Sequence, residues 1–326
     1  MVKTEDLVRR GYFPKELIPA FSTETLADAL PEIMGCDLKT IINKKKYSSS
    51  KCCLYSIPKV KHARRLLSIP NPLHQIILCQ TLEDNWPKLE AFFLKSKLSL
   101  STPKIAKGSN RRAVNPASTL KQLPEERVLR STSSRILLHA DVSRYYSTIY
   151  THTIPWALHS KVRAKVDRSD KLCGNVIDKC VRNTQDKQTL GIPTGPDTSL
   201  IISEIIGTAM DIRLSNELKD IKLNGYRYID DYYLFFSNWA QAEQATSKIH
   251  STAKHFELVT IQLYRIARMM LTLIITVCRS TTCTKIKNDI QCRGYLKLAF
   301  WNWPHEISKS GSADAVCGGL NSYGRR

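Results

Sequence analysis

Two adjacent carboxylates, Asp230 and Asp231, lie inside an aromatic and aliphatic run that extends from Tyr226 to Phe236. The run favours a strand, and burying two like charges side by side is costly unless a positive charge compensates them. A hairpin that turned at the pair would lift both side chains out of the core, because Asp is well tolerated in turns. A divalent cation would then compensate both charges, whereas an exposed Asp-Asp turn without a role would explain the same residues.

A third carboxylate follows another apolar run. Residues 135–140 predict a buried strand that ends at Asp141, and residues 142–149 predict a turn into a helix. A carboxylate at the C-terminal end of a core strand is a common catalytic group in sheet proteins. It is also a common helix cap, so Asp141 taken alone has two interpretations.

Two basic segments precede Asp141. Four Lys and Arg residues fall within residues 59–65, beside a short apolar strand that Pro70 closes, and residues 95–115 contain no carboxylate. Cations placed in this way could contact phosphate oxygens, and the second segment would suit a nucleic-acid track. A solvated basic loop is the alternative for each segment.

A Gly/Pro loop, residues 191–199, separates Asp141 from the Asp pair. Its glycines would allow a flat ligand to approach the backbone closely, although most such loops are simply turns. A helix should follow this loop, capped by Asp197, Thr198 or Ser199. Further helices are expected near residues 22–30, stopped by Pro31, and over residues 73–82 and 239–256.

Composition restricts the partner rather than the chemistry. The 326-residue chain is 42% hydrophobic and carries a net charge of +20, which indicates a folded protein attracted to nucleic acid or to an acidic membrane surface. No apolar run approaches the ~20 residues of a membrane span, and the expected polyanion is nucleic acid, with no membrane partner. The ten cysteines include no Cys-x-x-Cys pair, which favours reduced thiols in a cytosolic protein over zinc sites.

In chain order, these segments resemble the motifs of reverse transcriptases over about residues 57–258. Residues 228–231 resemble the Tyr-x-Asp-Asp box, and residues 140–146 resemble the first catalytic-aspartate motif. Residues 191–195 look like the loop that packs under the templating base pair, and residues 65–70 look like the fingers motif.

The resemblance implies an α+β fold with the fingers and palm of a right-hand polymerase, in which helices pack on an antiparallel palm sheet. It divides the chain into a helical extension with a basic linker (1–56), fingers and palm (57–258), and an atypical tail (259–326). The usual C-terminal helical part would be missing or degenerate.

The resemblance also implies a site. Two Mg²⁺ ions, for which Mn²⁺ could substitute, would catalyse nucleotidyl transfer. Asp141 and Asp230 would bridge them, the backbone carbonyl of Val142 would add a ligand, and Asp231 would complete the primer side. The expected nucleotide-binding residues are Arg65, Lys59, Lys61, Tyr146 as a steric gate against ribose, Gly191, Pro193, Thr194 and Gly195. The expected nucleic-acid contacts are Tyr228, Ile229, Arg111 and Arg112.

The implied partners are dNTPs and a DNA or RNA primer-template, in a bacterial cytoplasm, with a homo-oligomer left open. Residues 10–17, together with Thr194 where many relatives carry Gln, resemble the abortive-infection branch, which defends bacteria against phage and includes prophage-encoded members. That branch implies synthesis that needs no template or is primed on protein. A retron or group II intron enzyme, and an inactive nucleic-acid-binding remnant, are the alternatives.

The tail departs from the family pattern. Residues 259–326 hold four of the ten cysteines and only three carboxylates, with no clear periodicity. A shifted reading frame or a degraded prophage gene would give such a composition. We therefore hypothesise that residues 259–326 are a non-native tail.

Overall fold

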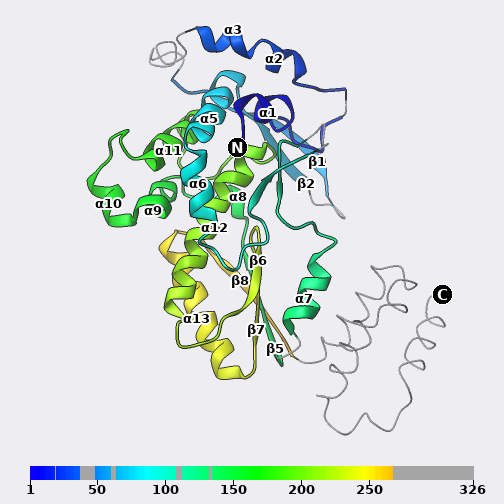
Figure 1. The fold of residues 1–326 in the computed structure, drawn as a ribbon, viewed down its shortest axis with the longest axis vertical. Helices are drawn as coiled ribbons and strands as arrows, with labels where there is room; N and C mark the ends of the chain where they lie inside the picture. The colour runs from blue at the N-terminus through cyan, green and yellow to red at the C-terminus, as the bar shows by residue number, and fades with distance from the viewer. Residues whose placement is uncertain (19, 37–47, 60–63, 108–111, 132–133, 267–326) are drawn as a thin grey trace, which may run out of the picture.

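The structure, a computed structural model, describes residues 1–18, 20–36, 48–59, 64–107, 112–131 and 134–266. Its central feature is an antiparallel sheet with the strand order β6-β7-β5-β8 (Figure 1). The strands are β5 (Ile136–Val142), β6 (Asn224–Tyr228), β7 (Asp231–Phe236) and β8 (Thr260–Ile266). The prediction of an α+β fold with an antiparallel sheet is confirmed at this level.

Alternation along the strands gives the sheet two different faces. Leu138, Ala140 and Val142 of β5 belong to the main core, whereas Leu137 belongs to a small second cluster on the opposite face. Helices α12 (Asp197–Glu217) and α13 (Trp239–His255) cover the core face, and α7 (Leu123–Ser131) lies beside β6 and β7 (Figure 1). Among the described residues, long helices therefore close only the core face of the sheet.

Helices and two small sheets surround this unit. Strand β2 (Arg64–Ile69) pairs with β1 (Cys53–Pro58), and β3 (Pro103–Ile105) pairs with β4 (Val114–Pro116). The other helices are α1 (Thr4–Arg9), α2 (Glu24–Asp28), α3 (Leu30–Gly35), α5 (Pro72–Asp84), α6 (Trp86–Phe93), α8 (Tyr145–Thr148), α9 (Thr153–His159), α10 (Lys161–Val166) and α11 (Cys173–Asn183).

Helix α12 runs through the middle of the molecule and is buried along most of its length (Figure 1). Apolar side chains occur around its whole circumference, which is typical of a helix enclosed by protein. The predicted side-chain cap is absent, because Pro196 holds the N-cap position and Asp197 is the first helical residue. The Asp197 carboxylate instead accepts hydrogen bonds from the backbone N–H groups of Ala113 and Val114.

One sequence prediction is wrong in its boundary. Pro31 does not stop a helix, because it lies in the first turn of α3, where proline is tolerated. Although the sequence shows no clear periodicity after residue 258, Thr260–Ile266 form β8 and pair with β5 along its whole length. Residues 267–326, the rest of the hypothesised tail, lie outside the described residues.

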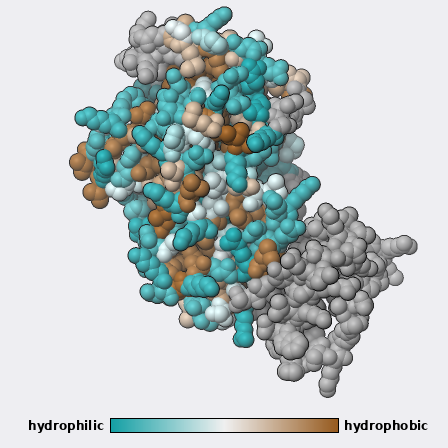
Figure 2. Space-filling view, viewed as in Figure 1, coloured by the Kyte–Doolittle hydropathy of each residue, from teal (hydrophilic) through white to brown (hydrophobic). Residues whose placement is uncertain are grey.

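The surface agrees with the charged composition. Hydrophilic side chains dominate the face shown in Figure 2, and apolar side chains form small separate patches. No helix in the described ranges is long and apolar enough to cross a membrane.

Candidate active site

Strand pairing brings the three predicted carboxylates together. Asp141 is the register partner of Asp231 across β5 and β7, and directly opposed residues have Cβ atoms about 4.5–5.5 Å apart. Asp230 occupies the turn between β6 and β7, and its carbonyl accepts a hydrogen bond from the Val142 N–H at 3.1 Å. Two segments that are remote in sequence thus supply one acidic cluster.

The acidic cluster is electrostatically costly as it stands. Burial, followed by the charge of Asp231, raises the pKa of Asp230 to about 6. Burial and the same neighbour also raise the pKa of Asp141, while His139 lowers it. A positive charge bound at this end of the strands would relieve the repulsion.

The cluster lies on the sheet face opposite α12 and α13. His139 is on that face, with its Nε2 atom 2.7 Å from Oδ1 of Asp231 and its ring stacked on Tyr233 at 4.4 Å between centroids. The guanidinium of Arg127, from α7, lies 4.4 Å from the centroid of the Tyr233 ring. Aromatic and cationic groups therefore continue from the carboxylates along the same face.

The donor chemistry of the cluster suits a hard cation, since carboxylate and carbonyl oxygens are the ligands that Mg²⁺ prefers. Within the described part of the chain, no three His, Cys, Asp or Glu side chains already converge to hold a metal ion. Mg²⁺ is usually held by one or two carboxylates together with waters and substrate phosphates, rather than by an all-protein cage. The residues therefore fit an ion that binds with its substrate.

The Gly/Pro loop is tied to the segment that follows Asp141. The N–H of Ile192 donates to the carbonyl of Tyr146, and the N–H of Gly191 donates to the carbonyl of Ile149, each at 2.8 Å. The Tyr146 side chain is half-buried, its hydroxyl lies 3.5 Å from Oγ of Ser203, and burial raises its pKa to about 12. The loop and Tyr146 thus form one assembly.

The same loop is joined to the β1–β2 hairpin. The N–H of Ser68 in β2 donates to the carbonyl of Thr194 at 2.9 Å. Arg65, three residues earlier, has a half-exposed side chain, 3.6 Å from the Glu16 carboxylate. Lys59 is exposed just after β1, and Lys61 lies outside the described residues.

The predicted nucleic-acid contacts come from two separate parts of the structure, the β6–β7 turn and the segment before β4. Tyr228 and Ile229 border Asp230 at the β6–β7 turn, and both are partly buried. The guanidinium of Arg112 is paired at 2.9 Å with the buried carboxylate of Asp197. Arg111 lies outside the described residues.

The N-terminal segment packs on the Gly/Pro loop. The carbonyl of Gly11 accepts from the N–H of Asp197 at 2.8 Å. Gly195 has a φ of +135°, and a Cβ there would lie only 2.4 Å from Cγ of Pro14. A side chain at residue 195 is therefore excluded both by the backbone conformation and by Pro14.

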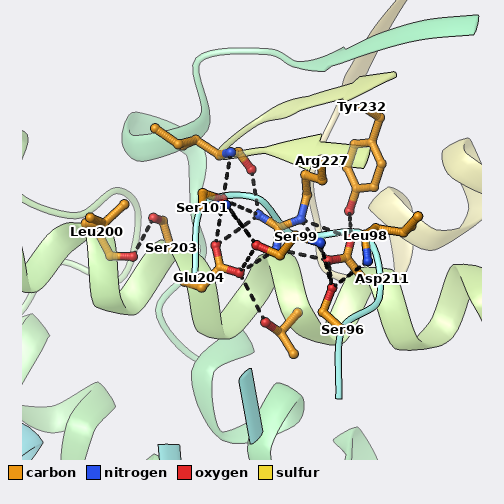
Figure 3. A network of polar contacts seen from close by, with 12 residues as sticks. Ser96, Leu98, Ser99, Ser101, Leu200, Ser203, Glu204, Asp211, Arg227 and Tyr232 are labelled. Carbon is orange, nitrogen blue, oxygen red and sulfur yellow. Dashed lines mark hydrogen bonds and ion pairs between the residues drawn. The ribbon is translucent and has the colours of Figure 1, made fainter. Parts of the chain in front are cut away.

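Sequence reasoning missed a buried polar network beneath the turn (Figure 3). Arg227 is almost fully buried and forms ion pairs with Glu204 at 2.7 Å and Asp211 at 2.9 Å, both from α12. The two acids are seven residues apart on a helix whose central part is rich in apolar residues. This spacing places them on the same face and was the available signal, because buried acids require a cation.

Among known proteins, similarity is found only with solved structures. No family model matches the chain, and no curated protein matches it. A solved structure of apo telomerase from Candida tropicalis, truncated from its C-terminal domain, is similar with a TM-score of 0.45 and 11% sequence identity. The match covers 78% of this chain and 58% of the telomerase chain.

Proposed function

We propose that this protein is a metal-dependent nucleotidyltransferase of the reverse transcriptase type, which adds dNTPs to a 3′ end. The observation that carries the proposal is the pairing of Asp141 with Asp231, with Asp230 in the adjoining turn. Three carboxylates with little compensation at one end of a sheet match the ligand set that the sequence motifs imply. A pure nucleic-acid binder would gain nothing from acids facing a polyanion.

The acidic cluster would hold Mg²⁺ through Asp141, Asp230 and the backbone carbonyl of Val142, with Asp231 on the primer side. When bound, such ions activate the 3′-hydroxyl and neutralise the triphosphate. The protein itself fixes the spacing of the ligands, because the β5–β7 register and the hydrogen bond from Val142 to Asp230 hold them in place.

The Gly/Pro loop and Tyr146 would form the nucleotide pocket. The Tyr146 carbonyl accepts a hydrogen bond from the Ile192 N–H, which holds the Tyr146 backbone beside the loop that contains Gly191, Pro193, Thr194 and Gly195. An aromatic ring beneath the sugar would clash with a ribose 2′-hydroxyl and select deoxynucleotides. Arg65 is on the strand bonded to this loop and would contact the triphosphate, assisted by Lys59 or Lys61.

The test is incorporation of labelled dNTPs by the purified protein, with Mg²⁺ or Mn²⁺ and with or without an RNA template. Asp230→Ala should abolish incorporation, whereas Asp220→Ala, at an exposed acid after α12, should retain it. Activity that survives Asp230→Ala would reject the catalytic assignment. A wild type that binds nucleic acid but incorporates nothing would instead support the inactive-remnant alternative.

The finer proposal is membership of the abortive-infection branch, with a role in defence against phage. It is supported by contact between the segments that carry that resemblance, since Gly11 and Pro14 pack against Asp197 and Gly195 beside Thr194. Expression of the wild type should reduce phage plating efficiency, and Asp230→Ala should not. Strict dependence on an RNA template, without protection from phage, would favour a retron or intron-type enzyme.

A further inference from the structure

The residue between Tyr228 and Asp230 has an unfavourable backbone conformation. Ile229 has a φ of +58°, in the left-handed region. A β-branched residue is a genuine outlier there, because its Cβ crowds the adjoining carbonyl oxygen. Such a conformation persists only where surrounding contacts enforce it.

Both polar backbone groups of Ile229 are held by side chains. Its N–H donates to Oγ of Ser101 at 2.9 Å, and its carbonyl accepts from Nη1 of Arg227 at 3.0 Å. Ser101 comes from the segment before β3, and Arg227 comes from β6. Two separate segments of the chain therefore hold the turn. We call these two side chains the turn clamp.

Ser101 has no spare hydrogen-bonding capacity. Its hydroxyl donates to Oε2 of Glu204 at 2.9 Å and accepts from Ile229 and from Nη1 of Arg227, the latter at 3.2 Å. A serine hydroxyl offers one donor and two lone pairs, and all three are used here. Oγ of Ser99 also lies 3.4 Å from this hydroxyl, a longer contact than the other three, so those three partners define the geometry of the clamp.

Helix α12 anchors the clamp. Glu204 and Asp211 hold the guanidinium of Arg227, with Nη2 of Arg227 at 2.7 Å from Glu204 and Nε at 3.0 Å from Asp211 (Figure 3). The helix begins at Asp197, directly after the last proline of the Gly/Pro loop. Helix α12 therefore anchors both the turn that carries Asp230 and the loop proposed to bind the nucleotide.

From these contacts we infer that Arg227 and Ser101 are positioning residues, which hold the Ile229 turn left-handed and so aim the Asp230 carboxylate at the reacting nucleotide. The inference rests on the proposed function for its catalytic consequence. Neither side chain is required to touch substrate or metal. Their contribution should therefore affect the chemical step more than nucleotide binding.

The first test measures the turn without measuring activity. Ser101→Ala should accelerate hydrogen exchange of the Ile229 amide by about 10-fold, because the amide loses its acceptor. The amide of Tyr233, in the paired part of β7, should exchange as in the wild type. Unchanged exchange at Ile229 would overturn the inference, whether or not the protein is a polymerase.

The second test measures dNTP incorporation. Ser101→Ala should lower kcat by about 10-fold and change the KM for dNTP by less than about twofold. Ser96→Ala is the matched control, because Ser96 hydrogen-bonds Asp211 in the same network but does not contact Ile229. Equal losses in kcat for the two variants, or a loss confined to KM, would contradict a positioning role.

A double-mutant cycle separates positioning from general stability. Gly adopts the left-handed conformation freely, so Ser101→Ala should cost less kcat in an Ile229→Gly background than in the wild type. If the Arg227→Lys variant folds, it should lose kcat as Ser101→Ala does. If it does not fold, the Ser101→Ala results alone test the positioning role. Losses that multiply independently would overturn the inference. A wild type without polymerase activity would reject the proposed function, leaving hydrogen exchange to decide whether the clamp holds the turn.

Discussion

His139 and Asp231 contact each other across β5 and β7, with Nε2 and Oδ1 2.7 Å apart, beside the register pair of Asp141 and Asp231. The Asp231 carboxylate is therefore fixed by a neighbour on the adjacent strand. This contact links the acidic cluster to the aromatic face that Tyr233 and Arg127 continue.

Loss of this contact should impair the proposed reaction. His139→Phe keeps a ring that can stack on Tyr233 but loses the hydrogen bond, so kcat/KM for dNTP incorporation should fall by about 10-fold. His139→Gln retains a donor and should lose less activity. Equal activity of the Phe, Gln and wild-type proteins would show that the contact does not organise Asp231.

The stability of the protein should depend on Asp197 at mildly acidic pH. Burial raises the pKa of this carboxyl to about 6, against an ordinary value of 3.8. Because the pKa of Asp197 is higher in the folded than in the unfolded protein, ionisation of this carboxyl destabilises the folded state. This destabilisation is complete above pH 6 and absent below pH 3.8. This residue alone should thus add up to about 3 kcal/mol to the free energy of unfolding as the pH falls through that window.

The measurement for Asp197 is urea unfolding from pH 7 to pH 4 for the wild type and Asp197→Asn. Asp230 titrates in the same direction, so the wild-type curve contains both contributions and the difference between the two proteins isolates Asp197. The Asn variant should show a weaker dependence on pH. Parallel curves would contradict the assigned pKa.

Gly195→Ala should destabilise the fold. The substitution places a Cβ against Pro14 at a φ of +135°, at an expected cost of about 1–3 kcal/mol in the free energy of unfolding. Gly35→Ala is the control, because nothing lies within 4 Å of a Cβ there. A similar urea midpoint for the two variants would show that Pro14 and the loop do not depend on each other.

Tyr146 should determine sugar selectivity. Tyr146→Ala should relax the exclusion of ribonucleotides, whereas Tyr146→Phe should retain it, because the proposed clash involves the ring rather than the hydroxyl. Single-nucleotide incorporation of matched dNTP and rNTP measures the ratio. If the Ala variant discriminates as well as the wild type, another residue is the gate.

Strand β8 lies within the hypothesised non-native tail but pairs with β5 of the central sheet. A chain that ends after Val259 loses the strand paired with β5 and exposes a sheet edge. It should melt more than about 5 °C below a chain that ends after Ile266, and it should aggregate more readily. Equal melting temperatures for the two chains would show that the sheet does not require β8.

The sequence alone determined the main elements of the centre of the molecule. An apolar run predicted the strand before Asp141, aromatic and aliphatic content predicted the hairpin around Asp230, and helical spacing predicted α12 and α13. These are local signals, since periodicity depends on residues that are close in the chain. The order of the acidic and glycine-rich segments also led to the proposed chemistry.

Only the tertiary structure decided how these elements meet. The β5–β7 register that opposes Asp141 and Asp231, and the pairing of β8, depend on contacts between distant segments. The turn clamp was equally invisible, because Ser101, Glu204 and Arg227 satisfy one another only after folding. A buried charge is tolerated only with its partners in place, so only the fold shows that Glu204 pairs with Arg227 beneath the turn.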